Sequence, residues 1–245
     1  MPTSQDAPIA YPLIRSPYGD SALCYPLPAM ERLPLFPLNT VLFPGVPLPL
    51  HVFEERYRLM IGRCVDEQGL FGVVLIREGV EVGGDAEPHD IGTTARITHV
   101  QRLPDGRMNL ITVGRRRFRV VALDRSEPYL QGDVEYVASV EVDAPDVAPV
   151  AERVAALYGE QKRLSMALSG QWTRTVGLPR DPDALADAVA AGLDQPAATK
   201  QELLAELSLP RRLKREVDLL GERIRALTER WEEQRARRYS GATLN

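Results

Sequence analysis

The sequence contains few of the residues on which most metal sites and disulfide frameworks depend. It has two cysteines, Cys24 and Cys64, and three histidines, His51, His89 and His99. One thiol falls in a proline-rich segment and the other on a predicted helix, so we predict free thiols rather than a disulfide. The histidines are spread over different predicted β elements. A metal site would form only if the fold brought them together, and we predict no metal site.

The common motifs of nucleotide and peptide hydrolysis are also absent. No G-x-x-x-x-G-K-[ST] phosphate loop, G-x-S-x-G elbow or H-E-x-x-H helix occurs in the sequence. Lysine is scarce, and Lys162 forms a helical i, i+3 pair with Ser165. Such a pair is typical of an ordinary helix surface rather than of an activated nucleophile. We therefore predict no catalytic residues, no cofactor and no enzyme activity.

Long apolar runs and a strong positive charge are missing as well. Prolines interrupt every apolar stretch before it reaches the roughly 20 residues that a membrane helix needs. The first twenty residues lack the basic start and apolar run of a signal peptide. The formal net charge of the 245 residues is −4, which does not favour nucleic acid as a partner. These features predict a cytoplasmic chain without a membrane partner.

The chain does contain an unusual mixture of apolar residues and prolines between Leu33 and Met60, LPLFPLNTVLFPGVPLPLHVFEERYRLM. Proline lacks an N–H and is excluded from central strands. The pattern predicts very short strands at 33–36, 40–43 and 47–53, with prolines at their edges, starts and turns. A helix is predicted over 54–67, where apolar residues recur at helical spacing. This arrangement is typical of a small curved barrel rather than of a flat sheet.

A β-rich half and a helical half follow one another along the chain. Further strands are predicted at 70–77, 92–103, 108–114, 117–126 and 129–137, and helices at 150–168, 182–193, 199–207 and 209–231. Thr199 with Glu202 predicts a capping box at the start of the third helix. The predicted organisation is a proline-rich tail (1–30), a β-rich part (31–142) and a helical part (143–245), with the sequence DAPDVAP as the connection.

The last predicted helix carries an apolar seam with alternating spacings of four and three. Its members are Leu213, Val217, Leu220, Ile224, Leu227 and Trp231. The chain's own helices can cover this seam within a bundle, or a second copy can cover it in a coiled-coil dimer. The bundle does not depend on concentration, so we favour a monomer.

Two strings of the sequence are similar to a known family. These are LPLFPLNTVLFPGVPLPLHVFEERYR and IGTTARITHVQRLPDGRMNLITVGRRRFRVV. They resemble the substrate-binding N-terminal domain of Lon proteases, and more closely the free-standing bacterial proteins that consist of that domain. The resemblance covers about 31–238, whereas the segment 1–30 departs from the family pattern.

The resemblance implies an α+β fold, in which a PUA-like twisted β pseudobarrel precedes a helical bundle that ends in a long helix. It also implies a non-catalytic protein that binds unfolded or extended polypeptides. Such a protein would act as an adaptor or regulator of proteolysis or protein quality control, with a protease or chaperone as partner.

Apolar residues of the proline-rich segment are the candidates for a polypeptide-binding surface. They are Phe43, Val46, Leu48, Phe53 and Tyr57. Most of them also suit a position in the core. A proline-studded rim with phenylalanine and leucine can offer an apolar surface without an exposed strand edge.

An alternative interpretation is an RNA-binding protein, because PUA-like folds permit one. Its candidate residues are Arg115, Arg116 and Arg117, the one basic cluster of the β-rich half. The overall acidity of the chain favours a different structure, in which these arginines point outward from a strand and pair with Asp or Glu.

Overall fold

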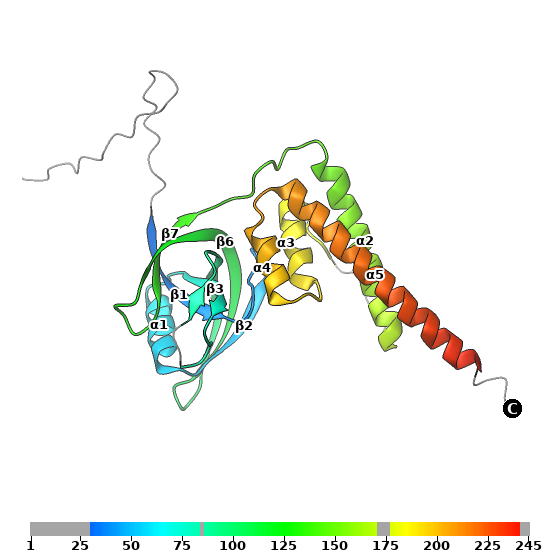
Figure 1. Cartoon of the computed structure of the whole chain (residues 1–245). Coiled ribbons are helices and arrows are strands. Elements are labelled where there is room, and N and C mark those ends of the chain that lie inside the picture. The colour runs from blue at the N-terminus through cyan, green and yellow to red at the C-terminus, as the bar shows by residue number, and fades with distance from the viewer. Residues whose placement is uncertain (1–29, 84–85, 171–176, 241–245) are drawn as a thin grey trace, which may run out of the picture.

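The structure, a computed structural model, describes residues 30–83, 86–170 and 177–240, with the backbone alone for 237–240 (Figure 1). The strands of this part are β1 (Glu31–Leu38), β2 (Pro47–Val52), β3 (Phe71–Glu78), β4 (Glu87–Pro88), β5 (Ile91–Arg102), β6 (Met108–Asp124) and β7 (Gln131–Tyr136). Its helices are α1 (Glu55–Asp66), α2 (Val147–Ser169), α3 (Pro182–Gly192), α4 (Ala197–Ala205) and α5 (Leu209–Ser240). The predicted tail lies outside the described residues except for Met30.

The sheet closes into a ring because β1 changes its partner halfway along its length. Residues 31–34 pair antiparallel with β7, and residues 35–38 pair in parallel with β3. From β7 the sheet continues through β6 and β5 back to β3, while β2 pairs with β6 and β4 with β3 (Figure 1). This ring is not a true barrel. Together with the helices that follow it and end in the long α5, it confirms the predicted α+β fold.

Four of the five prolines between Leu33 and Met60 lie in strand segments that have a pairing neighbour on one side within the described structure, and Pro44 lies in a turn. Pro47 and Pro49 belong to β2, which pairs with β6 along one edge. In β1, Pro34 lies in the part that pairs with β7, and Pro37 in the part that pairs with β3. A strand with one neighbour leaves half of its N–H groups without a ladder partner, so a missing N–H is tolerated there. The predicted placement of the prolines at edges is confirmed.

Helix α1 packs its apolar face against the inside of the ring. Tyr57, Met60, Ile61 and Cys64 recur at helical spacing, and all four are buried. Cys64 is a free thiol, as predicted, and burial raises its pKa to about 11. The other cysteine lies outside the described residues. In Figure 1, α1 lies on the side of the ring away from α2, α3, α4 and α5.

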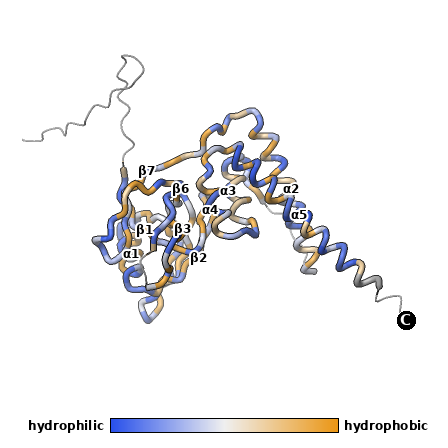
Figure 2. Tube along the Cα trace, viewed as in Figure 1, coloured by the Kyte–Doolittle hydropathy of each residue, from blue (hydrophilic) through white to orange (hydrophobic). Residues whose placement is uncertain are grey.

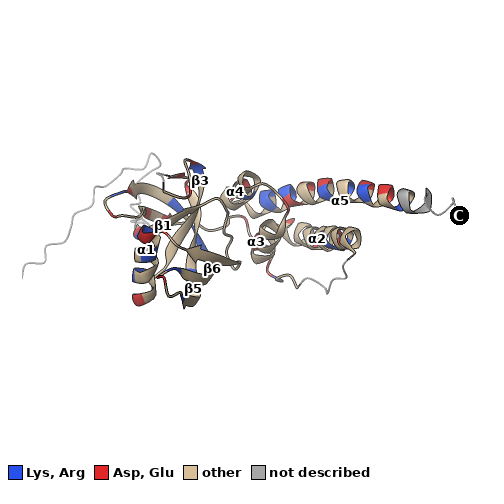
Figure 3. Ribbon diagram, turned by 90° about the horizontal axis from the view of Figure 1, so that it is seen from below, with Lys and Arg blue, Asp and Glu red and all other residues tan. Residues whose placement is uncertain are grey.

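The long helix α5 packs along α2 and also contacts α3. Figure 2 shows apolar and polar residues alternating along α5. Figure 3 shows both basic and acidic residues along its length. Of the predicted seam, Leu213, Leu220 and Leu227 are buried, and the three other members are partly buried. The chain's own helices therefore cover much of the seam. The number of copies in solution stays a prediction.

Phe43 joins the ring to the helices. It is fully buried in the same apolar cluster as residues of α2, α3 and α5. The predicted strand over 40–43 is wrong, because this stretch forms a bend and an irregular segment. It passes so close to β6 that a Cβ on Gly114 would lie 2.2 Å from the Phe43 carbonyl oxygen. The capping box is also wrong, since α4 begins before Thr199.

Candidate functional site

A cavity of about 230 Å³ opens between β2, the start of α1 and the loop that joins β3 to β4. Its apolar lining consists of Phe36, Leu38, Pro49, Leu50, Val52, Phe53, Tyr57 and Val82. Its polar lining consists of His51, Glu54 and Glu81. Liquid water takes up about 30 Å³ per molecule, so the cavity has room for a side chain in place of several waters.

Two stacked aromatic rings lie at the base of the cavity, and two exposed apolar side chains lie at its mouth. Phe36 and Tyr57 stack at its base with ring centroids 4.1 Å apart. Burial raises the pKa of the Tyr57 hydroxyl. At the mouth, Phe53 is 48% and Val82 is 55% exposed. Phe53 follows Val52 at the end of β2, and since successive strand residues face opposite sides, the burial of Val52 directs Phe53 outward.

The β3–β4 loop is attached beside this cavity by two hydrogen bonds to carboxylates. The backbone N–H of Gly83 donates to Glu54 Oε2 at 3.2 Å, and the backbone N–H of Asn39 donates to Glu81 Oε2 at 3.0 Å. Gly83 has a φ of 71°, a conformation that favours glycine. These contacts place Val82 and Glu81 at the cavity, although they are far from β2 in the sequence.

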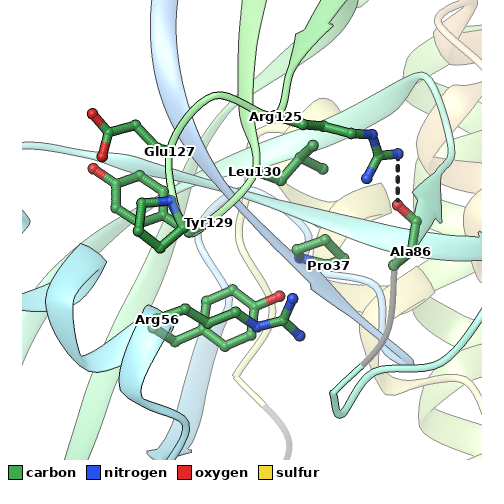
Figure 4. A pocket seen from close by; sticks show the side chains of 9 residues that line it. Pro37, Arg56, Ala86, Arg125, Glu127, Tyr129 and Leu130 are labelled. Carbon is green, nitrogen blue, oxygen red and sulfur yellow. Dashed lines mark hydrogen bonds between the residues drawn. The ribbon is translucent and has the colours of Figure 1, made fainter.

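A smaller cavity, of about 90 Å³, also has Tyr57 in its lining (Figure 4). Arg125 donates a hydrogen bond to the Ala86 carbonyl oxygen across it at 3.4 Å. Arg56, which also lines it, pairs with Glu54 at 3.1 Å. Its small volume and its internal polar contacts make it less suited to an apolar side chain than the larger cavity.

The structure brings together two of the five predicted polypeptide-binding residues. Phe53 and Tyr57 both line the larger cavity. Phe43 is fully buried under the helices, Val46 packs against the same cluster, and Leu48 packs against the core of the ring. The sequence carries no periodic signal that would distinguish them, because all five lie in one apolar, proline-rich stretch.

The lining residues that sequence reasoning missed come from β1, β2, the residue before α1 and the β3–β4 loop. Glu81 and Val82 lie in a polar, glycine-rich stretch that was assigned only as a loop. Leu50 was assigned to the correct strand but not to the site. Only the ring closure brings these residues to the mouth of one cavity.

The three arginines of the predicted basic cluster do not form one patch. Arg115 is exposed, and the Arg116 guanidinium stacks over the Tyr136 ring at 3.9 Å. Arg117 is 4% exposed and points toward the helices, where it binds the carboxylate of Asp187. The expected outward arginine paired with an acid occurs two residues later instead, at Arg119. The structure therefore offers no observation that favours RNA binding through these residues.

Arg117 belongs to a buried charged cluster between the ring and the helices. It donates to Asp187 Oδ2 at 3.2 Å and, through Nε, to the Leu204 carbonyl oxygen at 3.1 Å. Arg212 of α5 is fully buried and binds Asp183 of α3. These pairs join β6 to α3, α4 and α5.

Glu216 is the fifth charged group at this interface. Its side chain is fully buried, and both carboxylate oxygens lack a hydrogen-bond partner within the described structure. Burial raises its pKa well above the ordinary value, against the opposing effect of Arg212. Two guanidinium groups and two carboxylates already balance, so Glu216 is accommodated in its protonated form.

Two remaining candidates, one for catalysis and one for metal binding, make structural contacts. Lys162 donates to the Gly192 carbonyl oxygen at 3.3 Å. His51 lies 2.7 Å from the side-chain oxygen of Asn109, between ring Nδ1 and Oδ1. Among residues 30–83, 86–170 and 177–240, no three His, Cys, Asp or Glu side chains gather in a way that would hold a metal ion. Within the same ranges, every helix is too short or too polar to cross a membrane.

Comparison with known proteins finds a family model that matches most of the chain. A model of the ATP-dependent protease La (LON) substrate-binding domain matches residues 32–222. The chain is 33% identical over 191 residues to the Lon protease of Anaeromyxobacter dehalogenans, covering 77% of this chain and 23% of that protein. It is also 33% identical over 198 residues to Lon protease 2 of Myxococcus xanthus, covering 78% and 23%. The chain thus spans about a quarter of the length of these relatives.

Two solved structures have a similar fold. A Lon N-terminal domain protein from Xanthomonas campestris matches with a TM-score of 0.55 and 29% identity, over 76% of this chain and 96% of that chain. The N-terminal domain of Lon protease from the Mycobacterium avium complex matches with a TM-score of 0.61. At 20% identity, over 78% of this chain and 98% of that chain, the second match bears on the fold alone.

Proposed function

Because this chain belongs to the family of Lon substrate-binding domains, we propose that it binds unfolded or extended polypeptides and that the cavity beside Tyr57 holds one of their apolar side chains. One observation carries the proposal. The cavity is open, and two large apolar side chains, Phe53 and Val82, stand exposed at its mouth. An apolar cavity with a small number of polar groups is the usual form of a ligand site.

Strand β2 supports binding through side chains rather than through backbone pairing. Pro47 and Pro49 are two residues apart, so their backbone nitrogen atoms point to the same side of β2. Because β6 pairs with the other side, these nitrogen atoms lie on the outer edge of the strand. With no N–H at these two positions, a polypeptide cannot add a continuous ladder to this edge. Binding through one or two side chains does not require the ligand to pair with a strand edge.

The expected affinity is modest. Burial contributes about 25 cal/mol per Å² of apolar surface, and the ordering of an extended polypeptide offsets much of that gain. We therefore expect dissociation constants in the micromolar range, about 1–100 μM. Such binding suits a protein that passes its ligand to another, so we propose a role as an adaptor or regulator for a protease or chaperone.

The proposed role is non-catalytic. The family model covers a substrate-binding domain, and the sequence lacks a phosphate loop and an activated Ser–Lys site. We expect the purified chain to show neither ATP hydrolysis nor peptide cleavage. Turnover above that of a heat-treated sample, after copurifying enzymes are excluded, would contradict this part of the proposal.

The binding site is tested with a labelled, unfolded apolar peptide and fluorescence anisotropy. Phe53→Ala and Val82→Ser are expected to weaken binding about five- to tenfold each, since they remove apolar surface at the mouth. Val121→Ser is the matched control, because Val121 is 53% exposed on β6 and does not line the cavity. Unchanged binding by both cavity variants, with native circular dichroism, would place the site elsewhere.

A further inference from the structure

The mouth of the cavity carries an uncompensated negative charge. Glu54 and Glu81 line the cavity, and among the described residues that line it there is no Lys or Arg. Glu54 is balanced by Arg56, whose Nη2 lies 3.1 Å from its Oε2. Glu81 accepts a hydrogen bond from the Asn39 backbone but forms no ion pair within the described residues.

Glu81 lies near enough to the cavity base to influence it. Burial chiefly raises the pKa of the Tyr57 hydroxyl, the neighbouring Arg56 opposes that rise, and the charges of Glu54 and Glu81 add to it. Both carboxylates line the same cavity as this ring. Glu55, exposed at the start of α1, adds a further negative charge beside Glu54.

The neighbouring cations do not cancel this charge. Arg56 is engaged by Glu54, and its guanidinium lies over the Tyr57 ring at 4.6 Å. Arg58 points toward the turn between β5 and β6, where it donates to the Asp105 carbonyl oxygen at 3.4 Å. Of the two carboxylates that line the cavity, Glu81 is thus the one without an ion-pair partner within the described residues.

We propose that the preferred ligand is an apolar residue flanked by Lys or Arg, and that segments flanked by Asp or Glu are disfavoured. This inference rests on the proposed function, which supplies the apolar side chain in the cavity. A flanking ammonium or guanidinium group would lie close to Glu81 and Glu55. A flanking carboxylate would face the same groups with like charge, which costs binding free energy.

The test uses three labelled peptides with one apolar core and flanking Lys, Gln or Glu residues. At low salt, we expect the Lys peptide to bind about two- to fivefold more tightly than the Gln peptide, and the Glu peptide to bind more weakly than both. At 0.5 M NaCl these differences should shrink, because exposed charges are screened over a few ångströms. Equal affinities at low salt would overturn the inference.

Variants separate this inference from the proposed function. Glu81→Gln retains an oxygen that can accept from Asn39, and it should narrow the ratio between the Lys and Glu peptides. Glu152→Gln changes the net charge equally on the exposed surface of α2 and should leave the ratio unchanged. If Phe53→Ala weakens all three peptides while the parent protein does not discriminate among them, the charge preference fails and the site stands. If Phe53→Ala has no effect, the site itself fails. A ratio that survives Glu81→Gln would overturn the assignment to Glu81.

Discussion

Phe43 and Phe53 lie on either side of strand β2, and their environments are opposite. Phe43 is fully buried under the helices, and Phe53 is 48% exposed beside the cavity. Both come from the same apolar, proline-rich stretch, so their local sequence does not account for the difference. What differs is the element that packs against each end of the strand. Helices α2, α3 and α5 cover the first end of β2, near Phe43. At the second end, near Phe53, α1 and the β3–β4 loop leave the side chain exposed.

Charged residues of β6 show a similar contrast over a shorter distance. Arg117 faces the helices and pairs with Asp187, and both side chains are almost fully buried. Arg119 pairs with Glu135 at 2.7 Å, and its side chain is 47% exposed. The charged residues on the helix-facing side of the ring thus attach the helices, whereas Arg119 forms an ion pair near the surface.

The largest effect on stability, and the sharpest contrast, should come from comparing Phe43 with Phe53. Phe43→Ala is expected to lower the free energy of unfolding by about 3–5 kcal/mol, because it leaves a cavity where the ring meets the helices. Phe53→Ala should change it by no more than about 0.5 kcal/mol, while it weakens peptide binding. Urea denaturation followed by circular dichroism measures both. Equal losses of stability would remove the contrast between the two ends of β2.

A comparable loss is expected from the buried arginine. Arg117→Ala removes both hydrogen bonds of the buried Asp187 carboxylate, leaves it only Arg212 at 4.0 Å, and should cost about 3–5 kcal/mol of unfolding free energy. Arg119→Ala, the matched control on the same strand, should cost less than about 1 kcal/mol. The double variant Arg117→Ala/Asp187→Ala should lose less unfolding free energy than the sum of the losses in the two single variants. Strict additivity would show that the pair is not coupled.

A smaller effect, dependent on pH, should follow from Glu216→Gln. The folded-state pKa of Glu216 is raised, so between its unfolded and folded pKa values the folded chain holds a proton that the unfolded chain releases. The free energy of unfolding therefore falls as pH rises above about 4.5, by about 1.4 kcal/mol for each unit of the raised pKa. In the variant, glutamine carries no titrating proton, so the unfolding free energy does not fall with pH for this reason.

The variant should therefore match the parent chain near pH 4 and become progressively more stable than it toward pH 8. Arg117, Asp187 and Arg212 face the same carboxyl and are unchanged in the variant. Thermal unfolding of both proteins at four pH values measures the difference. A stability difference that does not change with pH would contradict a raised pKa.

The smallest effect on stability is expected at the edge of β2. Replacing Pro47 and Pro49 together by Thr restores two N–H groups on the outer edge and should change the unfolding free energy by no more than about 0.5 kcal/mol. The new donors make the edge able to pair with another strand, so self-association should increase with concentration. Sedimentation of the variant beside the parent chain measures this. Identical sedimentation at high concentration would show that the prolines do not protect the edge.

Local patterns in the sequence predicted most elements but not all their boundaries. The spacing of Tyr57, Met60, Ile61 and Cys64 was sufficient for α1 and its buried face. The capping box predicted at Thr199 was wrong, because α4 begins at Ala197, directly after Pro196. The stretch 40–43 was also misread, since Phe43 is buried by contacts with the C-terminal helices and Leu42 by contacts with the core of the ring, without strand pairing. A boundary that depends on long-range packing leaves no periodic trace in the sequence.

The sequence by itself determined the order of a β-rich half and a helical half, the edge positions of the prolines and the family. The order of the halves and the proline positions depend on backbone chemistry and on periodicities that act over a few residues, whereas the family was inferred from the resemblance of two sequence strings. Only the tertiary structure decided that Arg117 is buried, that Glu216 lies unpaired at the same interface, and that Phe53 meets Val82 at one cavity. Each of these follows from the closure of the ring or from the packing of the helices against it, which brings together residues that no local pattern connects.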